Sequence, residues 1–192
     1  MVDLVGLHKH FIMEHLREGD VAVDFTMGNG NDTLFLSKAV GESGRVFAFD
    51  IQEDALASTR EHLIANGAPE NYTLICASHH RVKEFVNEPI KAGMFNLGYL
   101  PRSGRKAVTT MRETTMPAVE AALELLAPDG VLIVAIYPGH EEGALEGEML
   151  RKYFAGLSKY RICPSEFKIL NSPTSPYFFL VEKSPKAKFG EI

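Results

Sequence analysis

Apolar runs of strand length alternate with stretches of helical period from Asp20 to Lys183, and this alternation constrains the fold more than any other feature. The runs that predict strands are 21–25, 45–51, 72–77, 94–99, 130–137, 160–169 and 177–182. The stretches that predict helices are 32–40, 53–66, 79–86, 117–126 and 142–157, with a further helix before the first strand. Pro117 suits the first turn of its helix, where a missing N–H leaves no partner unpaired. Strands and helices that alternate in this way form one parallel sheet.

The connections between the predicted strands set their directions. Helical crossovers join the first five strands, so these strands run parallel. The last two strands are joined only by the turn segment 170–176, which is too short for a helical crossover, so they pair antiparallel. The sequence therefore predicts a Rossmann-like α/β fold with a mostly parallel seven-stranded sheet, an antiparallel edge strand and helices on both faces. We expect a single domain over residues 1–192, with a loosely held tail at 183–192.

The composition is that of an ordinary globular protein, with 45% hydrophobic and 23% charged residues. Charged residues interrupt the first twenty positions, which predicts neither a signal peptide nor a membrane span, so we expect a cytoplasmic protein. Cys76 and Cys163 each lie in an apolar run without a Cys or His neighbour, and we expect both to be buried, unpaired thiols. The chain has no residue pattern typical of a metal site, and no metal cofactor is expected.

The first predicted strand runs into the segment DFTMGNGNDT, where Gly28 and Gly30 precede a helix. Glycines at this bend allow a tight turn and let a ligand lie against the backbone. A dinucleotide site usually has a third glycine here, but this chain has Thr33, and Asp32 would repel a pyrophosphate at the helix N-terminus. An acidic loop with Asp24 and Asp32 suits a cationic cofactor instead, such as S-adenosylmethionine with its sulfonium and ammonium groups.

The second predicted strand ends in Asp50, which is placed to accept hydrogen bonds from ribose hydroxyl groups. The third ends at Ser78 and His79, which are candidates for adenine contact. Ser78 has the alternative role of capping the next helix, and His79 the alternative of a surface or helix-start residue. The full set of candidate cofactor residues is Asp24, Thr26, Gly28, Asn29, Gly30, Asn31, Asp32, Thr33, Asp50, Ile51, Gln52, Ser78 and His79.

The end of the fourth predicted strand should face the transferred group, because ligands of open α/β sheets gather at the carboxyl ends of the strands. It reads FNLGYLP and resembles the Asn/Asp-Pro-Pro-Tyr/Phe motif of methyltransferases that act on amino groups, with Asn96 and Tyr99 at the outer positions. His140 follows the fifth strand at the same edge. We take these three residues as the catalytic candidates; the alternatives are a packing tyrosine and a histidine bonded to a loop carbonyl.

The segments DFTMGNGNDTLFL, FNLGYLP and IYPGHEEG together resemble the bacterial tRNA 5-aminomethyl-2-thiouridine methyltransferases, a family within the class I methyltransferases that use S-adenosylmethionine. The resemblance covers nearly the whole chain. It implies methylation of the primary amine of 5-aminomethyl-2-thiouridine at the wobble position of tRNA. One departure follows FNLGYLP, where this chain has residues 102–104 (Arg-Ser-Gly) and the family tends to have Gly-Gly-Asp.

A tRNA substrate requires positive charge near the same edge of the sheet. Arg102, Arg105, Lys106 and Arg112 follow the fourth predicted strand and are the candidates for contact with RNA near the anticodon. The alternatives in function are a methyltransferase of rRNA or of a small-molecule amine, and a nicotinamide-dependent oxidoreductase or a silent binding domain. The oligomeric state stays open, with a homodimer as one option.

Overall fold

The computed structural model describes residues 4–97, 110–139 and 141–192. The helices are α1 (Leu4–His15), α2 (Asn31–Val40), α3 (Glu53–Ala65), η1 (His79–Glu84, a 3₁₀ helix), α4 (Arg112–Leu125) and α5 (Glu141–Ala155). The strands are β1 (Val21–Asp24), β2 (Arg45–Asp50), β3 (Tyr72–Cys76), β4 (Ile90–Leu97), β5 (Leu126–Ile136), β6 (Ile162–Phe167) and β7 (Tyr177–Lys183).

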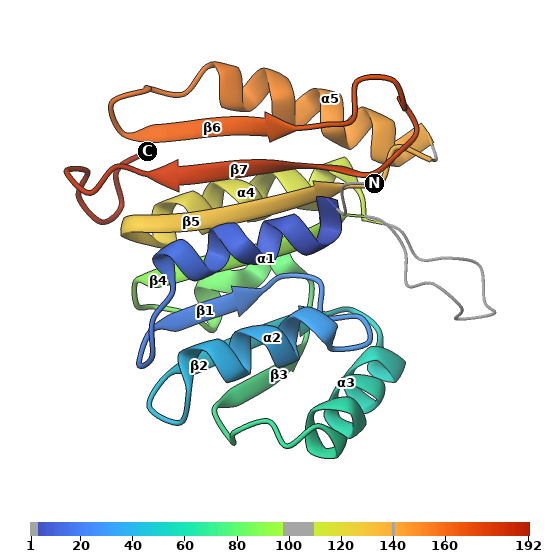
Figure 1. Ribbon diagram of the computed structural model, residues 1–192, viewed down its shortest axis with the longest axis vertical. Coiled ribbons are helices and arrows are strands. Elements are labelled where there is room, and N and C mark those ends of the chain that lie inside the picture. Colours follow the sequence, from blue (N-terminus) through green and yellow to red (C-terminus); the bar gives the residue numbers. More distant parts are fainter. Residues whose placement is uncertain (1–3, 98–109, 140) are drawn as a thin grey trace.

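The seven strands form one sheet in the order β3-β2-β1-β4-β5-β7-β6 (Figure 1). Strands β1 to β5 pair parallel with one another, whereas β7 pairs antiparallel with both β5 and β6. The predicted mostly parallel sheet and the antiparallel closing pair are confirmed. The strand that runs against the others is β7, one place in from the edge. The order reverses between β1 and β4, which is the position where ligands bind in open sheets of this kind.

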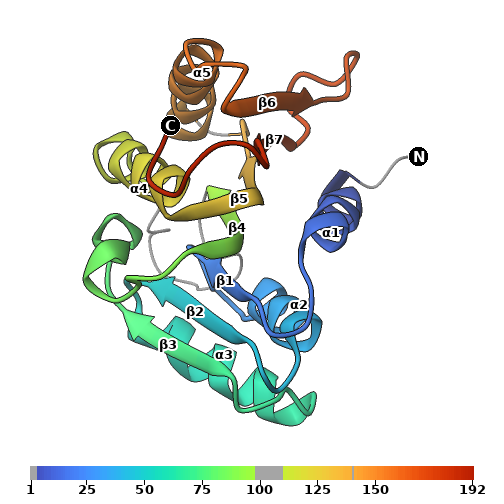
Figure 2. The ribbon, with the colours of Figure 1, turned by 90° about the vertical axis from the view of Figure 1, so that its left-hand side faces the viewer.

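Helices lie on both faces of the sheet (Figure 2), and apolar side chains pack between them and the strands, as the crossovers require. On one face α1 and α2 contribute Ile12, Leu16 and Leu36 to a core with the alternate side chains of the central strands. On the other face η1, α4 and α5 close a larger core that includes the parallel rings of Phe25 and Phe95, whose centroids are 4.1 Å apart. These two cores hold the carboxyl ends of β1 and β4 side by side.

Helix α4 begins five residues before Pro117, whereas the sequence predicted Pro117 in its first turn. The earlier start is stabilised because the backbone N–H groups of Thr114 and Thr115 both donate to the Met111 carbonyl oxygen. Strands β4 and β5 also begin earlier than predicted, at Ile90 and Leu126, and both starting residues are fully buried.

The predicted loose tail is wrong for its first part, because Lys183 ends β7 with its side chain buried and Ala187 is also buried. Lys183 Nζ donates to the carbonyl oxygen of Leu123 at the end of α4, and the Gly190 N–H donates to that of Glu124. These bonds to the last turn of α4 hold the segment against the body of the domain.

Cys76 and Cys163 are free thiols as predicted, but both are exposed, which corrects the prediction that they are buried. The reason is the strand order, because Cys76 lies on β3 and Cys163 on β6, the two edge strands of the sheet. An apolar run on an edge strand is not covered as fully as one in the centre of the sheet.

None of the helices in the described part of the chain is long and apolar enough to cross a membrane.

Candidate functional site

Asp24 ends β1 at the centre of the carboxyl edge, and its side chain has no exposed surface. Its Oδ2 accepts a hydrogen bond of 2.7 Å from the Thr33 hydroxyl at the start of α2, and its Oδ1 accepts one of 3.1 Å from the Thr26 N–H. Thr33, which stands where a dinucleotide site has its third glycine, thus connects α2 to the end of β1. The carboxylate is therefore fixed in place beneath the glycine loop.

Burial, and after it the nearby charge of Asp32, raise the pKa of Asp24 to about 7, against the opposing effect of the Thr33 hydrogen bond. A carboxylate in such a place is stabilised by a cation and destabilised by a second anion. The electrostatics of this loop therefore match a positively charged ligand.

The loop between β1 and α2 turns through two glycines with positive φ, 52° at Gly28 and 81° at Gly30. Thr59 of α3 lies directly behind the loop: its hydroxyl donates to the Gly28 carbonyl oxygen, and a Cβ on Gly30 would come within 2.9 Å of its methyl carbon. Ser58 Oγ bonds the Asn29 side chain in the same way, at 3.3 Å. The glycines are thus required both by the turn and by the close approach of α3.

Asp50 ends β2 beside the loop and accepts hydrogen bonds from two backbone N–H groups, Gly28 to its Oδ2 at 3.1 Å and Gln52 to its Oδ1 at 3.0 Å. Ile51, which lies between Asp50 and Gln52 in the sequence, is 55% exposed although it is a large apolar residue. The structure therefore brings together the predicted acidic residue at the end of the second strand, the glycine loop and an apolar surface next to both.

Ser78 precedes η1 in the N-cap position, but its hydroxyl bonds His80 Nδ1 at 2.8 Å, and no side-chain capping hydrogen bond forms. His79 is the first residue of η1, as the helix-start alternative predicted, but it is 7% exposed and packs edge-on against Phe95, so it is not a surface residue. Burial lowers the pKa of His79 to about 4, which keeps its ring neutral. Both residues lie at the carboxyl edge, after β3.

Asn96, near the end of β4, contacts the glycine loop through two hydrogen bonds. Its backbone N–H donates to Thr26 Oγ1 at 2.8 Å, and its side-chain Nδ2 donates to Asp32 Oδ2 at 2.6 Å. The candidate acceptor residue and the candidate cofactor loop are therefore in direct contact. Asn31 and Asn29 lie on the exposed side of the same loop.

Three residues that the sequence analysis did not single out also surround Asp32. Lys9 Nζ lies 3.0 Å and His8 Nε2 4.0 Å from Asp32 Oδ1, both from α1. Tyr137, directly after β5, has its pKa raised by burial and then by the charge of Asp32. No periodic signal in the sequence marks this contact, because it depends on how α1 crosses the sheet.

Arg112 begins α4 and is paired with Glu142 of α5, with Nε 2.9 Å from the carboxylate oxygen that its backbone N–H also contacts. This cation is therefore less available to RNA than the sequence suggested. Five other predicted site residues lie outside the described residues: Tyr99, Arg102, Arg105, Lys106 and His140.

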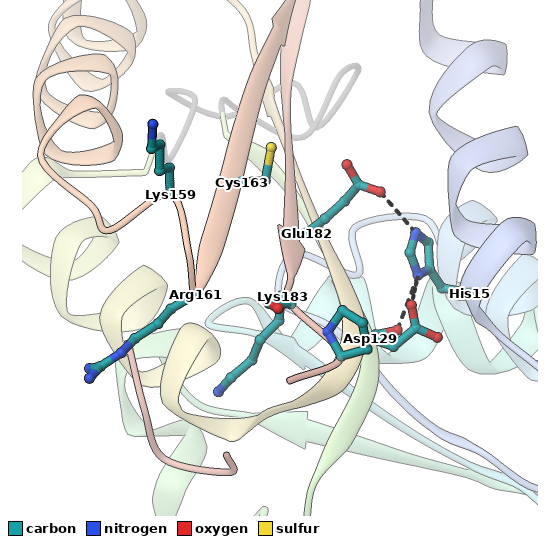
Figure 3. A pocket seen from close by; sticks show the side chains of 9 residues that line it. His15, Asp129, Lys159, Arg161, Cys163, Glu182 and Lys183 are labelled. Carbon is teal, nitrogen blue, oxygen red and sulfur yellow. Dashed lines mark hydrogen bonds and ion pairs between the residues drawn. The ribbon is translucent and has the colours of Figure 1, made fainter. Parts of the chain in front are cut away.

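A pocket lies at the opposite end of the strands from the glycine loop, where β5 begins and β7 ends (Figure 3). His15 of α1 contacts Glu182 through Nε2 at 3.3 Å and Asp129 through Nδ1 at 3.4 Å. The side chains of Arg161 and Lys183 in the same lining point away from His15 (Figure 3). We interpret His15 as an attachment of the end of α1 to two strands.

The residues at the carboxyl edge of β1 and β2 fit S-adenosylmethionine. The negative charge of the fully buried Asp24 would be matched by a cation, Asp50 would receive hydroxyl groups, and the two glycines with positive φ allow the tight turn of the loop beside them. This fit rests on side chains of β1, β2 and the loop between β1 and α2.

Comparisons with known proteins identify the family of the chain. The model of the family described as "Putative rRNA methylase" matches residues 46–183. A chloroplastic tRNA (mnm(5)s(2)U34)-methyltransferase of Arabidopsis thaliana is 36% identical over 185 residues, which are 91% of this chain and 67% of that protein.

Two solved structures share the whole fold. A "putative rRNA-methylase" of Clostridium thermocellum has a TM-score of 0.91 and 38% identity, covering 95% of this chain and 98% of that one. A protein of Streptococcus mutans described as "a putative methyltransferase", in complex with SAH, has a TM-score of 0.85 and 34% identity, covering 95% of this chain and 99% of that one. The alternative of a nicotinamide-dependent oxidoreductase is therefore wrong. The chain belongs to the rRNA methylase family and is a class I methyltransferase that uses S-adenosylmethionine.

Proposed function

We propose that the protein methylates the primary amine of 5-aminomethyl-2-thiouridine at the wobble position of tRNA. The observation that carries this proposal is the direct contact of Asn96 with the cofactor loop, through Thr26 and Asp32. An amide at this point is suited to hold an amino group next to the cofactor. The 36% identical relative named as a tRNA (mnm(5)s(2)U34)-methyltransferase supports the same substrate.

Methyl transfer demands little more of the protein than alignment. When bound, S-adenosylmethionine supplies a methyl group on sulfur: the amine nitrogen forms the new N–C bond, the C–S electron pair stays on sulfur, and a proton leaves the product ammonium for water. Asp24 would face the cationic part of the cofactor and Asp50 its ribose hydroxyls. The Gly28 to Gly30 turn would let the cofactor lie against the backbone.

On the acceptor side, Asn96 would accept a hydrogen bond from the amine and direct the nitrogen toward the cofactor. Tyr99 would stack on the base, and His140 would relay the departing proton to water; these two roles stand on the sequence alone. Arg102, Arg105 and Lys106 would contact phosphates of the anticodon arm. This division places the reacting amine between the ends of β4 and β5.

The test is transfer of labelled methyl from S-adenosylmethionine to total tRNA from cells that lack this enzyme, followed by nucleoside mass analysis. We expect methylaminomethyl-thiouridine as the labelled product, and its loss, by roughly hundredfold or more, in Asn96→Ala while SAH still binds. Parallel reactions with rRNA and with small amines test the alternative substrates. Label in rRNA with none in tRNA would contradict the proposal, and so would full activity of Asn96→Ala.

A further inference from the structure

The carboxylate of Asp32 joins side chains from two distant parts of the chain at the proposed acceptor site. Asn96 Nδ2 donates to Asp32 Oδ2 at 2.6 Å, and Lys9 Nζ lies 3.0 Å from Asp32 Oδ1. The Asp32 side chain is 14% exposed and that of Lys9 33% exposed. Because water reaches this bridge only in part, its charges interact more strongly than those of an ion pair on the open surface.

The bridge fixes which end of the Asn96 amide faces the substrate. An ionised carboxylate can only accept hydrogen bonds, so the group of Asn96 that faces Asp32 must be its NH₂. The backbone of Asn96 is held by its own bond to Thr26 Oγ1. The amide carbonyl oxygen therefore points away from Asp32. This carbonyl oxygen can accept a hydrogen bond from an N–H group of an incoming amine. Such a bond leaves the lone pair of the amine nitrogen free to attack the methyl group.

The bridge also sets the charge that the substrate meets. A carboxylate without a counterion would stabilise the ammonium form of an aliphatic amine, and this form has no lone pair with which to attack. Among the residues that the structure describes, the ionisable groups that face Asp32 are His8 and Lys9 from α1, Asp24 from β1 and Tyr137 after β5. Among them Lys9 is the one that carries a full positive charge at neutral pH, since histidine is charged only when protonated.

We infer that Lys9 and Asp32 are positioning residues for methyl transfer, where Asp32 turns the Asn96 carbonyl toward the substrate amine and Lys9 neutralises Asp32 so that the amine binds uncharged. This inference rests on the proposed function. It assigns a role at the acceptor site to the N-terminal helix, which lies outside the glycine loop and the strand ends.

The charge role is tested without turnover, in the complex of the protein with SAH and an anticodon stem-loop whose aminomethyl carbon is labelled with ¹³C. The pKa of the bound amine is measured by NMR titration. Lys9→Met should raise that pKa by about one unit relative to wild type, because the charge of Asp32 is then unbalanced. Lys38→Met, which removes an exposed lysine of α2, serves as the matched control and should leave it unchanged. The double variant Lys9→Met with Asp32→Asn should restore the wild-type value.

The orientation role is tested with Asp32→Asn, which keeps the shape but can donate as well as accept, and so no longer forces one orientation of the Asn96 amide. We expect kcat to fall by roughly hundredfold, a larger change than any rise in the KM for S-adenosylmethionine that the lost negative charge in the cofactor loop causes. An unchanged amine pKa in Lys9→Met or an unchanged kcat in Asp32→Asn would overturn the corresponding role. Failure of the wild-type enzyme to methylate the stem-loop would instead overturn the proposed function, so the two failures are distinguishable.

Discussion

Asp24 is a fully buried carboxylic acid whose proton equilibrium is tied to both folding and ligand binding. Its pKa is raised from 3.8 to about 7 in the folded protein. Between these values the folded state holds a proton that the unfolded state has lost, so raising the pH through this window removes stability. A bound cation opposes that loss, because it favours the ionised carboxylate.

We predict that the cofactor-free protein loses stability, of the order of a few kcal/mol, as the pH rises from about 4 to about 7. Asp24→Asn removes this ionisation, so the melting temperature of the variant should gain on that of wild type between pH 5 and pH 8. Binding of S-adenosylmethionine to wild type should strengthen over the upper part of the same window and be weak and nearly independent of pH in the variant. Thermal melts and titration calorimetry at several pH values measure both effects. Parallel pH profiles for the two proteins would show that Asp24 is not the group responsible.

The glycine loop and α3 act as one unit at the scale of secondary structure. A Cβ on Gly30 would lie 2.9 Å from the Thr59 methyl carbon and 3.1 Å from its Cα, so the added atom would press on the backbone of α3. Gly67 also has positive φ, 61°, but no atom lies within 4 Å of the position that a Cβ would occupy there. Comparing substitutions at Gly30 and Gly67 therefore separates the cost of backbone strain, which both share, from the cost of close packing, which only Gly30 has.

Gly67→Ala should destabilise the protein by about 1–2 kcal/mol through backbone conformation alone. Gly30→Ala should lose that amount and about 1–3 kcal/mol more, because α3 must move, and its SAH affinity should fall as well. Chemical denaturation with and without SAH measures both. Equal destabilisation by the two substitutions would contradict the proposed contact between the loop and α3.

The sequence predicted the strands and the glycine turn, because the residues within each of these segments determine its conformation. The five central strands are continuous apolar runs because both faces of the sheet are covered, and the bend at Gly28 and Gly30 is marked by its glycines. The start of α4 and the exposure of Cys76 could not be predicted locally, because the first depends on tertiary packing before Pro117 and the second on which strands form the edges. The same holds for Lys9, whose contact with Asp32 exists only once α1 has crossed the sheet.

At the scale of the whole molecule, the proposed function requires a chain of net charge −5 to bind a polyanion. We propose that the cations within residues 102–106, which follow β4 in the chain, bind the RNA phosphates. The net negative charge of the protein would then repel RNA from the rest of its surface. Arg112 is excluded from this cluster by its pairing with Glu142.

Replacement of both Arg105 and Lys106 by Gln should weaken tRNA binding and reduce the magnitude of the slope of log Kd against log salt concentration by about 1.5, as expected for two lost phosphate contacts. Arg112→Gln is the matched comparison and should change the slope little, since its guanidinium already has an anionic partner. Filter binding over a range of salt concentrations measures the slopes. A larger slope change for Arg112→Gln than for the double variant would assign the RNA contact to α4 instead.

We propose that this methyltransferase acts on one amino group of one tRNA nucleoside. This claim is tested most directly with two synthetic anticodon stem-loops that differ only at the wobble position, one with 5-aminomethyl-2-thiouridine and the other with 2-thiouridine. Each is incubated with the enzyme and S-adenosylmethionine, and its mass is measured. We predict the gain of a single methyl group, on the aminomethyl nitrogen, in the first stem-loop and no gain in the second. Methylation of both, or of neither, would contradict the claim.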